Sequence, residues 1–256
     1  MAKSDIDVQV LGPVRITGLA QPFRRSAARE LVVYLAFHRG GISQAECALA
    51  LWPDRAVAAS TMHSTSSDAR HALGFALLPR RGARLELAVP VSTDVDRFAA
   101  LAARGHPDRL LDALRLVRGV PFGGLRHADW AVLEGTQADI EGLVVETALR
   151  GAADLMALGR ASEAEWAVRR ALLVSPFDER LYRALLRATD ALGQRARLHA
   201  TMAQLIRLAG GAEQPWTRGP TRDNTARLGA VHPETVALYH DLLAGTPATG
   251  AHPSRQ

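Results

Sequence analysis

Hydrophobic positions near the start of the chain follow first a period of two and then a helical period. Around the turn at Gly12-Pro13, apolar residues alternate with others, which predicts a β-hairpin over residues 7–17. Further along, apolar residues recur at helical spacing and predict a helix over about residues 26–39. The positions that carry these patterns are Val8, Val10, Val14 and Ile16 for the hairpin, and Ala28, Leu31, Val32 and Leu35 for the helix.

Two more helices are predicted from their start and stop signals. Ser43 and Glu46 have the spacing of a capping box, in which each side chain accepts a hydrogen bond from the other residue's backbone N–H. This second helix ends before Pro53, which lacks the N–H that a helix needs. A third helix over about residues 58–73 is closed by Gly74.

A strand follows the third helix. Leu85, Leu87 and Val89 alternate with other residues and predict a strand over residues 84–89. Three helices followed by strands are typical of a winged helix-turn-helix, a fold that places its third helix in the DNA major groove. We therefore expect a DNA-binding-type domain over residues 1–92, with a wing at the strand.

The rest of the chain reads as helices that contain an internal repeat. Ala157-Leu158-Gly159 recurs as Ala191-Leu192-Gly193, 34 residues later, and this is the period of a tetratricopeptide helix pair. Ser162 to Glu165 has the pattern of a further capping box. We expect a tetratricopeptide-like domain over residues 93–244, interrupted by an irregular segment at 210–231 that contains Trp216, and a disordered tail over residues 245–256.

The composition agrees with this division. Aromatic residues make up only 5% of the chain, which favours packed helices over a β-sandwich. The fold class is therefore predicted as mainly α with a small β part, an α+β winged helix followed by an all-α domain. The net charge of +5 is modest for 256 residues, so the charge permits a nucleic-acid partner without requiring one.

Several classes of function find no support in the sequence. The motifs for nucleotide hydrolysis, for a serine nucleophile, for zinc proteolysis and for dinucleotide binding are all missing, so we expect no enzymatic activity and no cofactor. His232, Glu234, His240 and Asp241 fall near the last helix, but we interpret them as a solvated surface rather than a metal site. No stretch of about 18 apolar residues is present, so we expect a cytoplasmic protein without a membrane segment.

The candidate DNA contacts lie on the third helix and in the wing. Hydroxyl, imidazole and guanidinium groups donate to phosphates and to base edges. The candidates are Thr61, His63, Ser64, Ser67, Arg70, His71, Arg80, Arg81 and Arg84. Arg24, Arg25 and Arg29 offer a second basic edge at the first helix, although Arg29 is better explained as a residue that supports the surface of that helix. Ordinary solvated side chains explain these residues equally well, because the chain is rich in arginine throughout.

The order of short motifs along the chain resembles that of actinobacterial SARP-like transcriptional regulators. Those motifs are Val10-Leu11-Gly12-Pro13-Val14, Ala50-Leu51-Trp52-Pro53-Asp54, Arg70-His71-Ala72-Leu73-Gly74, Asp94-Val95-Asp96-Arg97-Phe98 and Ser175-Pro176-Phe177-Asp178-Glu179. The resemblance implies a response-regulator-type winged helix followed by a bacterial transcriptional activator domain. It also implies binding to double-stranded promoter DNA, with the helical domain supporting a homodimer or contact with RNA polymerase.

The third helix departs from the pattern of that family. Ala59, Asp68 and His71 stand where the family usually has basic residues, and a carboxylate at position 68 would repel phosphates if it faced DNA. Two hypotheses therefore remain. In the first, the chain regulates transcription by binding a promoter. In the second, it is a protein-interaction module whose degenerate winged helix no longer binds DNA.

Overall fold

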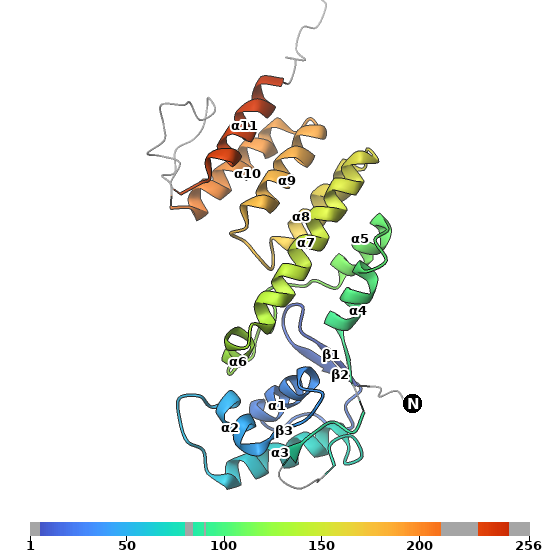
Figure 1. The fold of residues 1–256 in the computed structure, drawn as a ribbon, viewed down its shortest axis with the longest axis vertical. Coiled ribbons are helices and arrows are strands. Elements are labelled where there is room, and N and C mark those ends of the chain that lie inside the picture. Colours follow the sequence, from blue (N-terminus) through green and yellow to red (C-terminus); the bar gives the residue numbers. More distant parts are fainter. Residues whose placement is uncertain (1–5, 80–83, 90, 211–229, 246–256) are drawn as a thin grey trace, which may run out of the picture. The chain divides into compact units, whose positions relative to one another are not determined.

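The computed structural model describes residues 6–79, 84–89, 91–210 and 230–245 (Figure 1). Packing divides the chain into two compact units, residues 1–147 and 148–256. The helix α7, Thr136–Ala157, begins in the first unit and ends in the second. The domain boundary that the sequence predicts at residue 92 is not tested by this division and stays a prediction.

The first unit contains the predicted three-helix arrangement. Its strands are β1 (Asp7–Gln9), β2 (Arg15–Thr17), β3 (Ile42–Ser43), β4 (Arg84–Leu85) and β5 (Ser92–Thr93). Its first helices are α1 (Ser26–Phe37), α2 (Gln44–Leu51) and α3 (Ala59–Leu73). The predicted hairpin is confirmed, since β1 and β2 pair antiparallel with Val8 opposite Ile16.

Local signals set the ends of these helices. Ser43 accepts a hydrogen bond from the backbone N–H of Glu46, whose carboxylate accepts from the N–H of Ser43, so the capping box is confirmed. Gly74 closes α3 at a φ of 92°, a value that residues with a Cβ rarely adopt. The predicted strand over 84–89 was too long: β4 ends at Leu85, and the N–H of Ala88 bonds instead to the carbonyl of Leu77.

Residues that follow the winged helix in sequence pack against it within the first unit. They form α4 (Asp94–Ala102), α5 (Pro107–Arg115) and α6 (Asp129–Leu133). Strand β5 pairs parallel with β1, so the three-stranded sheet has the order β2-β1-β5. An aromatic cluster joins α1 to α6, where Tyr34 and Trp130 meet edge to face at 4.9 Å between ring centroids.

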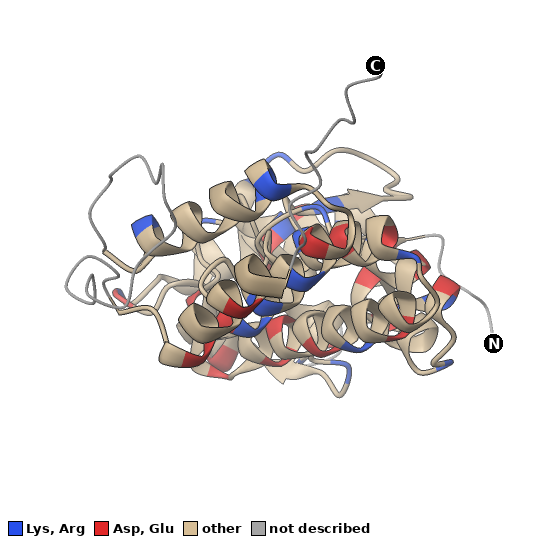
Figure 2. Ribbon diagram, turned by 90° about the horizontal axis from the view of Figure 1, so that it is seen from above, with Lys and Arg blue, Asp and Glu red and all other residues tan. Residues whose placement is uncertain are grey.

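One buried carboxylate connects the hairpin to α4. Asp94, whose side chain is 2% exposed, accepts hydrogen bonds from the backbone N–H groups of Val10 at 2.7 Å and Leu11 at 3.0 Å. The guanidinium of Arg118 lies 3.2 Å from the same carboxylate and supplies the opposite charge. Elsewhere, basic and acidic residues are interspersed along the helices (Figure 2), as in the pair of Arg109 with Asp112 at 3.3 Å in α5.

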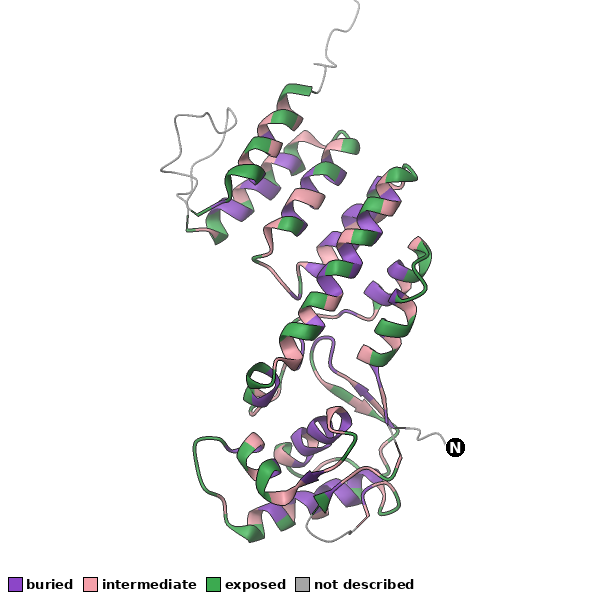
Figure 3. Ribbon diagram, in the orientation of Figure 1, coloured by how far each residue is buried: buried purple, intermediate pink, exposed green. Residues whose placement is uncertain are grey.

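The second unit contains the helices α8 (Ala161–Ala171), α9 (Glu179–Ala191), α10 (Arg195–Leu208) and α11 (Pro233–Gly245). Its helices turn their buried residues toward one another (Figure 3). Tyr182 and Tyr239, each 1% exposed, lie in a core cluster built from α9, α10 and α11. The irregular segment predicted at 210–231 lies almost wholly outside the described residues, as do Trp216 and the tail after Gly245.

The sequence repeat occupies equivalent places in the structure. Gly159 and Gly193 end α7 and α9 with φ values of 72° and 66°. The N–H that follows each glycine returns to a carbonyl five residues earlier, Arg160 to Leu155 and Gln194 to Thr189. These are the bonds of a Schellman-type helix end, repeated in both copies.

The start of α8 differs from the prediction. Its N-cap residue is Arg160, which makes no side-chain cap bond, so the capping box predicted at Ser162 is wrong. The turn at Gly159 leads directly into the helix, and Ser162 is therefore already inside it. Glu163 instead pairs with the guanidinium of Arg160 at 2.6 Å.

Candidate nucleic-acid interface

The inner face of α3 fastens the helix to the rest of the first unit. Met62, Ala69 and Leu73 recur at helical spacing and are all buried against the core. Ser66 is buried as well, and its hydroxyl donates a hydrogen bond to the carbonyl of His63 within the helix. The polar residue in the apolar stripe is thus satisfied locally, and the stripe still anchors the helix.

Asp68 does not face DNA. Its side chain is buried, and its carboxylate accepts hydrogen bonds from the backbone N–H groups of Arg24 at 3.0 Å and Arg25 at 2.9 Å. Arg25 is the N-cap residue of α1 and provides no side-chain cap of its own. Asp68 therefore holds the N-cap residue of α1 and the residue before it from another helix, at a helix start where the dipole favours a carboxylate. The interpretation of Asp68 as a repulsive residue on the DNA face is wrong.

Arg70 is also turned inward. The residue is 7% exposed, its Nε donates to the carbonyl of Leu78 at 3.0 Å, and its Nη1 donates to the hydroxyl of Ser66 at 3.2 Å. These bonds hold the segment after α3 against the helix. Arg70 was predicted to contact phosphate, and the structure corrects this, because the guanidinium is buried and bonded to Leu78 and Ser66.

The outer face of α3 is polar and carries no fixed charge. The five remaining candidates on this helix are Thr61, His63, Ser64, Ser67 and His71. The two histidines are exposed and the three hydroxyl residues are half-buried. Because both charged residues of α3 point inward, the surface that remains offers hydroxyl and imidazole groups only. Such groups read base edges by hydrogen bonding and add little attraction to phosphate.

The imidazole of His71 has a defined orientation. Its Nδ1 lies 2.7 Å from the carbonyl oxygen of Ser67, and the ring meets Phe75 edge to face at 5.1 Å. Since a carbonyl oxygen only accepts, Nδ1 carries a proton, and Nε2 of the neutral ring is left as an acceptor. An acceptor at this position suits the exocyclic amino group of adenine or cytosine in the major groove.

Positive charge lies beside α3 rather than on it. Arg24 and Arg25 are exposed, and Asp68 fixes their backbone next to the helix. The chain reaches them along α3, since the N–H of Ala20 bonds to the carbonyl of Ala72 at 2.8 Å. The structure thus raises the importance of this arginine pair, which the sequence offered only as a second edge.

The wing is described only in part. Arg84 is exposed on β4, and its Nη2 donates to the carbonyl of Gly41 at 2.7 Å. This bond places the guanidinium at the turn before β3, which pairs with β4. Arg80 and Arg81 lie outside the described residues.

Near the start of α11, His232 takes part in hydrogen bonds that join this helix to Glu179 of α9. The carboxylate of Glu179 accepts from the backbone N–H of His232 at 2.9 Å and from the hydroxyl of Thr235 at 2.6 Å. Among the described residues, no group of three or more metal-ligating side chains lies together. Within the same part of the chain, no helix has both the length and the apolar character to cross a bilayer.

Comparisons with known proteins agree with this architecture. Residues 91–202 match the family described as "Bacterial transcriptional activator domain". A solved structure of Mycobacterium tuberculosis EmbR, in complex with a low affinity phosphopeptide, is similar in fold with a TM-score of 0.61 at 21% sequence identity. That similarity covers 94% of this chain and 66% of the EmbR chain, slightly less than two thirds of its length. No match was found among curated protein sequences.

The domain match and the shared fold confirm the resemblance found in the sequence. The matched domain, residues 91–202, includes the motifs at Asp94 and Ser175 on which the resemblance to an activator domain rests, and the EmbR structure shares the fold of the chain. Residues 91–202 therefore carry a bacterial transcriptional activator domain, and the chain shares the fold of the EmbR structure.

Proposed function

We propose that the chain regulates transcription by binding double-stranded promoter DNA in the cytoplasm. In this proposal α3 lies in the major groove, where His63, Ser67 and His71 contact base edges. The exposed arginines beside the helix, Arg24 and Arg25, contact phosphates, together with the wing. The helical domain mediates homodimerisation or contact with RNA polymerase, and no catalytic step is assigned to the chain.

The observation that carries this proposal is the inward orientation of Asp68 and Arg70. The carboxylate that would repel DNA is buried at the start of α1, and it positions two exposed arginines beside α3. The outer face then combines groups that donate and accept hydrogen bonds with flanking positive charge. This division between base contacts and phosphate contacts is typical of sequence-specific DNA binding.

The test begins with the selection of genomic duplex fragments by the full chain at low salt. We expect enrichment of a discrete site, which anisotropy measurements would show to bind at least about a thousand-fold more tightly than unrelated duplex. His71→Ala should weaken binding to that site by roughly 1–3 kcal/mol and relax the preference at one base pair. Arg24→Ala should weaken binding to all duplexes alike, because phosphate contacts carry no sequence information.

A matched control is Arg187→Ala, which removes an exposed arginine of α9 in the second unit. It should leave DNA affinity unchanged. Failure to enrich any site at low salt, or equal losses for Arg24→Ala and Arg187→Ala, would contradict the proposal.

One observation favours a second function, that of an interaction module without DNA binding. The outward-facing side chains of Ala59–Leu73 include no arginine or lysine, so electrostatic attraction from this helix is weak. In that case the chain binds no duplex selectively, and substitutions at His63 and His71 leave its regulatory effect in cells unaltered.

A further inference from the structure

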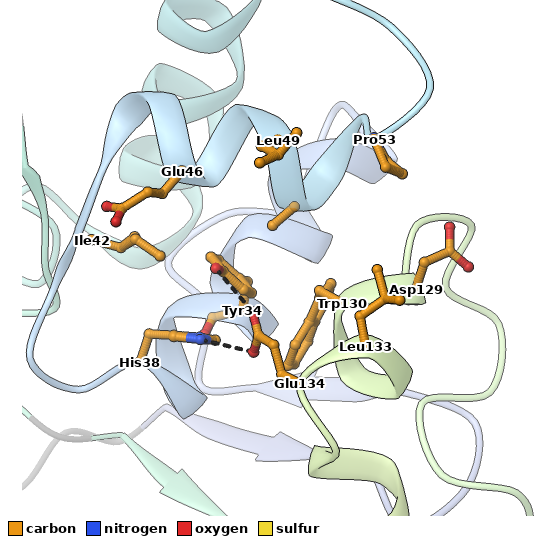
Figure 4. A pocket seen from close by; sticks show the side chains of 11 residues that line it. Tyr34, His38, Ile42, Glu46, Leu49, Pro53, Asp129, Trp130, Leu133 and Glu134 are labelled. Atoms are coloured by element: carbon orange, nitrogen blue, oxygen red, sulfur yellow. Dashed lines mark hydrogen bonds and ion pairs between the residues drawn. The ribbon is translucent and has the colours of Figure 1, made fainter.

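A groove on the first unit lies between α2 and α6, away from the outer face of α3. It has a volume of about 500 Å³ and is walled by α1, β3 and α2 on one side and by α6 on the other (Figure 4). This volume lies within the range of about 300–1,000 Å³ that is usual for ligand-binding sites. Its walls come from the winged helix and from the matched activator domain, so an occupant contacts both.

The rim of the groove exposes large apolar side chains. Leu49 of α2 is 68% exposed and Leu133 of α6 is 79% exposed, and both line the groove. Val132, the neighbour of Leu133 on α6, is 64% exposed. Single exposed leucines are ordinary, but a group of them around one cavity is typical of an interaction surface.

The floor of the groove carries an arranged set of polar groups. Glu134 accepts a hydrogen bond from the hydroxyl of Tyr34 at 3.4 Å, and its other oxygen lies 3.0 Å from Nε2 of His38 (Figure 4). Trp130 is 2% exposed, and no acceptor among the described residues lies within hydrogen-bond reach of its indole N–H. A buried donor without an acceptor is uncommon in folded proteins.

The charge around the groove has one sign. Glu46, Asp129 and Glu134 line it, and its lining includes no arginine or lysine. Arg84, which does not line the groove, attracts the carboxylate of Glu46 electrostatically, and the imidazole of His38 lies against the carboxylate of Glu134. Asp129 is exposed and has no ion-pair partner among the described residues. An occupant with positive charge is therefore favoured at the α6 side.

We propose that this groove is the docking site for an amphipathic segment of a partner protein that carries leucine-like anchors and basic flanks. The anchors would fill the cavity between Leu49 and Leu133, while arginine or lysine would lie against Asp129. A small molecule inside the cavity would leave the outer side of Leu133 exposed, so an extended occupant accounts better for the apolar rim. The inference does not depend on DNA binding, and its test uses no DNA.

The probe is a fluorescein-labelled helical peptide of about 14 residues, with leucines spaced three and four apart and arginines on the other face. Its anisotropy is measured against the full chain at physiological salt. We expect saturable binding, weakened at least about ten-fold when the arginines are replaced by glutamate or the leucines by serine. Asp129→Arg should reduce the difference in affinity between the arginine peptide and the glutamate peptide.

Leu133→Asp should weaken binding of the arginine peptide at least about ten-fold, because it places a charge on the apolar rim. Leu49→Asp tests the opposite wall in the same way. The matched control is Leu158→Asp, since Leu158 is 62% exposed at the end of α7 and lies outside the groove. All three side chains are exposed, and thermal melts verify that each variant is folded.

The proposal is overturned by any of three results. These are the absence of saturable binding, equal binding of the arginine and glutamate peptides, and equal effects of Leu133→Asp and Leu158→Asp. A neutral fragment that binds in the cavity while the peptides do not would make the groove a small-molecule site instead. None of these results bears on DNA binding, which the genomic selection measures separately.

Discussion

At the scale of single residues, the side chain of Asp68 connects two helices, α3 and α1. It belongs to α3, yet its hydrogen bonds go to the backbone at the start of α1, more than forty residues earlier. The N-cap residue of α1, Arg25, makes no side-chain cap hydrogen bond, and Asp68 holds the backbone of this residue instead. The same bonds fix two exposed arginines beside α3.

Asp68→Ala should therefore reduce the free energy of unfolding of the first unit by about 0.5–2 kcal/mol, because it leaves the backbone N–H groups of Arg24 and Arg25 without their acceptor. Urea denaturation monitored by circular dichroism measures the change. Asp54→Ala, at an exposed position in the turn before α3, is the control and should shift stability by less than about 0.5 kcal/mol. Similar losses in both variants would refute the role of Asp68 at the start of α1.

A second residue-scale prediction concerns pH. Burial lowers the pKa of His199, the positive charge of Arg195 lowers it further, and Nδ1 of the ring lies in hydrogen-bond contact with the hydroxyl of Tyr239. Because the folded pKa lies below the unfolded value of about 6.5, the unfolded state binds more protons at acid pH. The second unit should lose stability as the pH falls below about 6.5.

Thermal melts between pH 8 and pH 5 measure this loss. His199→Gln should flatten the profile, since glutamine does not titrate. His106→Gln changes an exposed histidine of the first unit and should leave the profile of the second unit as it was. An unchanged pH profile in His199→Gln would count against the assignment.

At the scale of elements, glycine has opposite roles inside α7 and just after its end. Gly159 ends the helix at a φ of 72°, whereas Gly142 lies inside the helix with nothing within 4 Å of an added Cβ. A side chain is strained at the first position and accommodated at the second. The repeat of the Gly159 turn at Gly193 explains why a three-residue match in sequence marked a real structural repeat.

Gly159→Ala should destabilise the chain by about 1–2 kcal/mol, because a Cβ disfavours the left-handed backbone. Gly142→Ala should stabilise it by roughly 0.5–1 kcal/mol, because alanine has less backbone entropy to lose in a helix. The urea midpoints of the two variants, measured in parallel, show whether each substitution raises or lowers the stability of the chain. Equal signs would contradict the assignment of Gly159 to a helix end.

Signals that span a few residues predicted the elements well. The capping box at Ser43 and the stop at Gly74 depend only on neighbouring residues, and both are confirmed. Asp68 bonds to Arg24 and Arg25, and Arg70 bonds to the carbonyl of Leu78 beyond the helix, so spacing along α3 could not show that both side chains point inward. One signal was present: Asp68 adjoins Ala69 of the buried stripe, while α1 lacks an N-cap acceptor of its own.

At the scale of the whole molecule, the placement of charge sets the salt dependence of the proposed DNA binding. The outer face of α3 carries no fixed charge, so phosphate contacts fall to the arginines beside it and in the wing. These candidates are Arg24, Arg25, Arg80, Arg81 and Arg84.

The slope of log K against log salt should then be no steeper than about −4.5 per protomer, from −0.9 for each neutralised phosphate. Anisotropy titrations from 50 to 300 mM salt give this slope. Arg25→Ala should reduce its magnitude by about 1, whereas Arg187→Ala should leave it unaltered. A steeper slope in the native chain would reveal phosphate contacts elsewhere on the molecule.

The carboxylate of Asp94 has a consequence for how such a gene can be divided. Two of the groups that satisfy it, the N–H groups of Val10 and Leu11, come from the beginning of the first unit, more than eighty residues earlier. Strand β5 takes its pairing from β1 in the same way. A chain cut at residue 90 would keep every residue of the matched domain and still lose these partners, leaving a buried charge held by Arg118 alone. A fusion that transfers the matched domain to another protein must therefore transfer the hairpin over residues 7–17 as well. The segment that folds as one unit is longer than the segment that the sequence family defines.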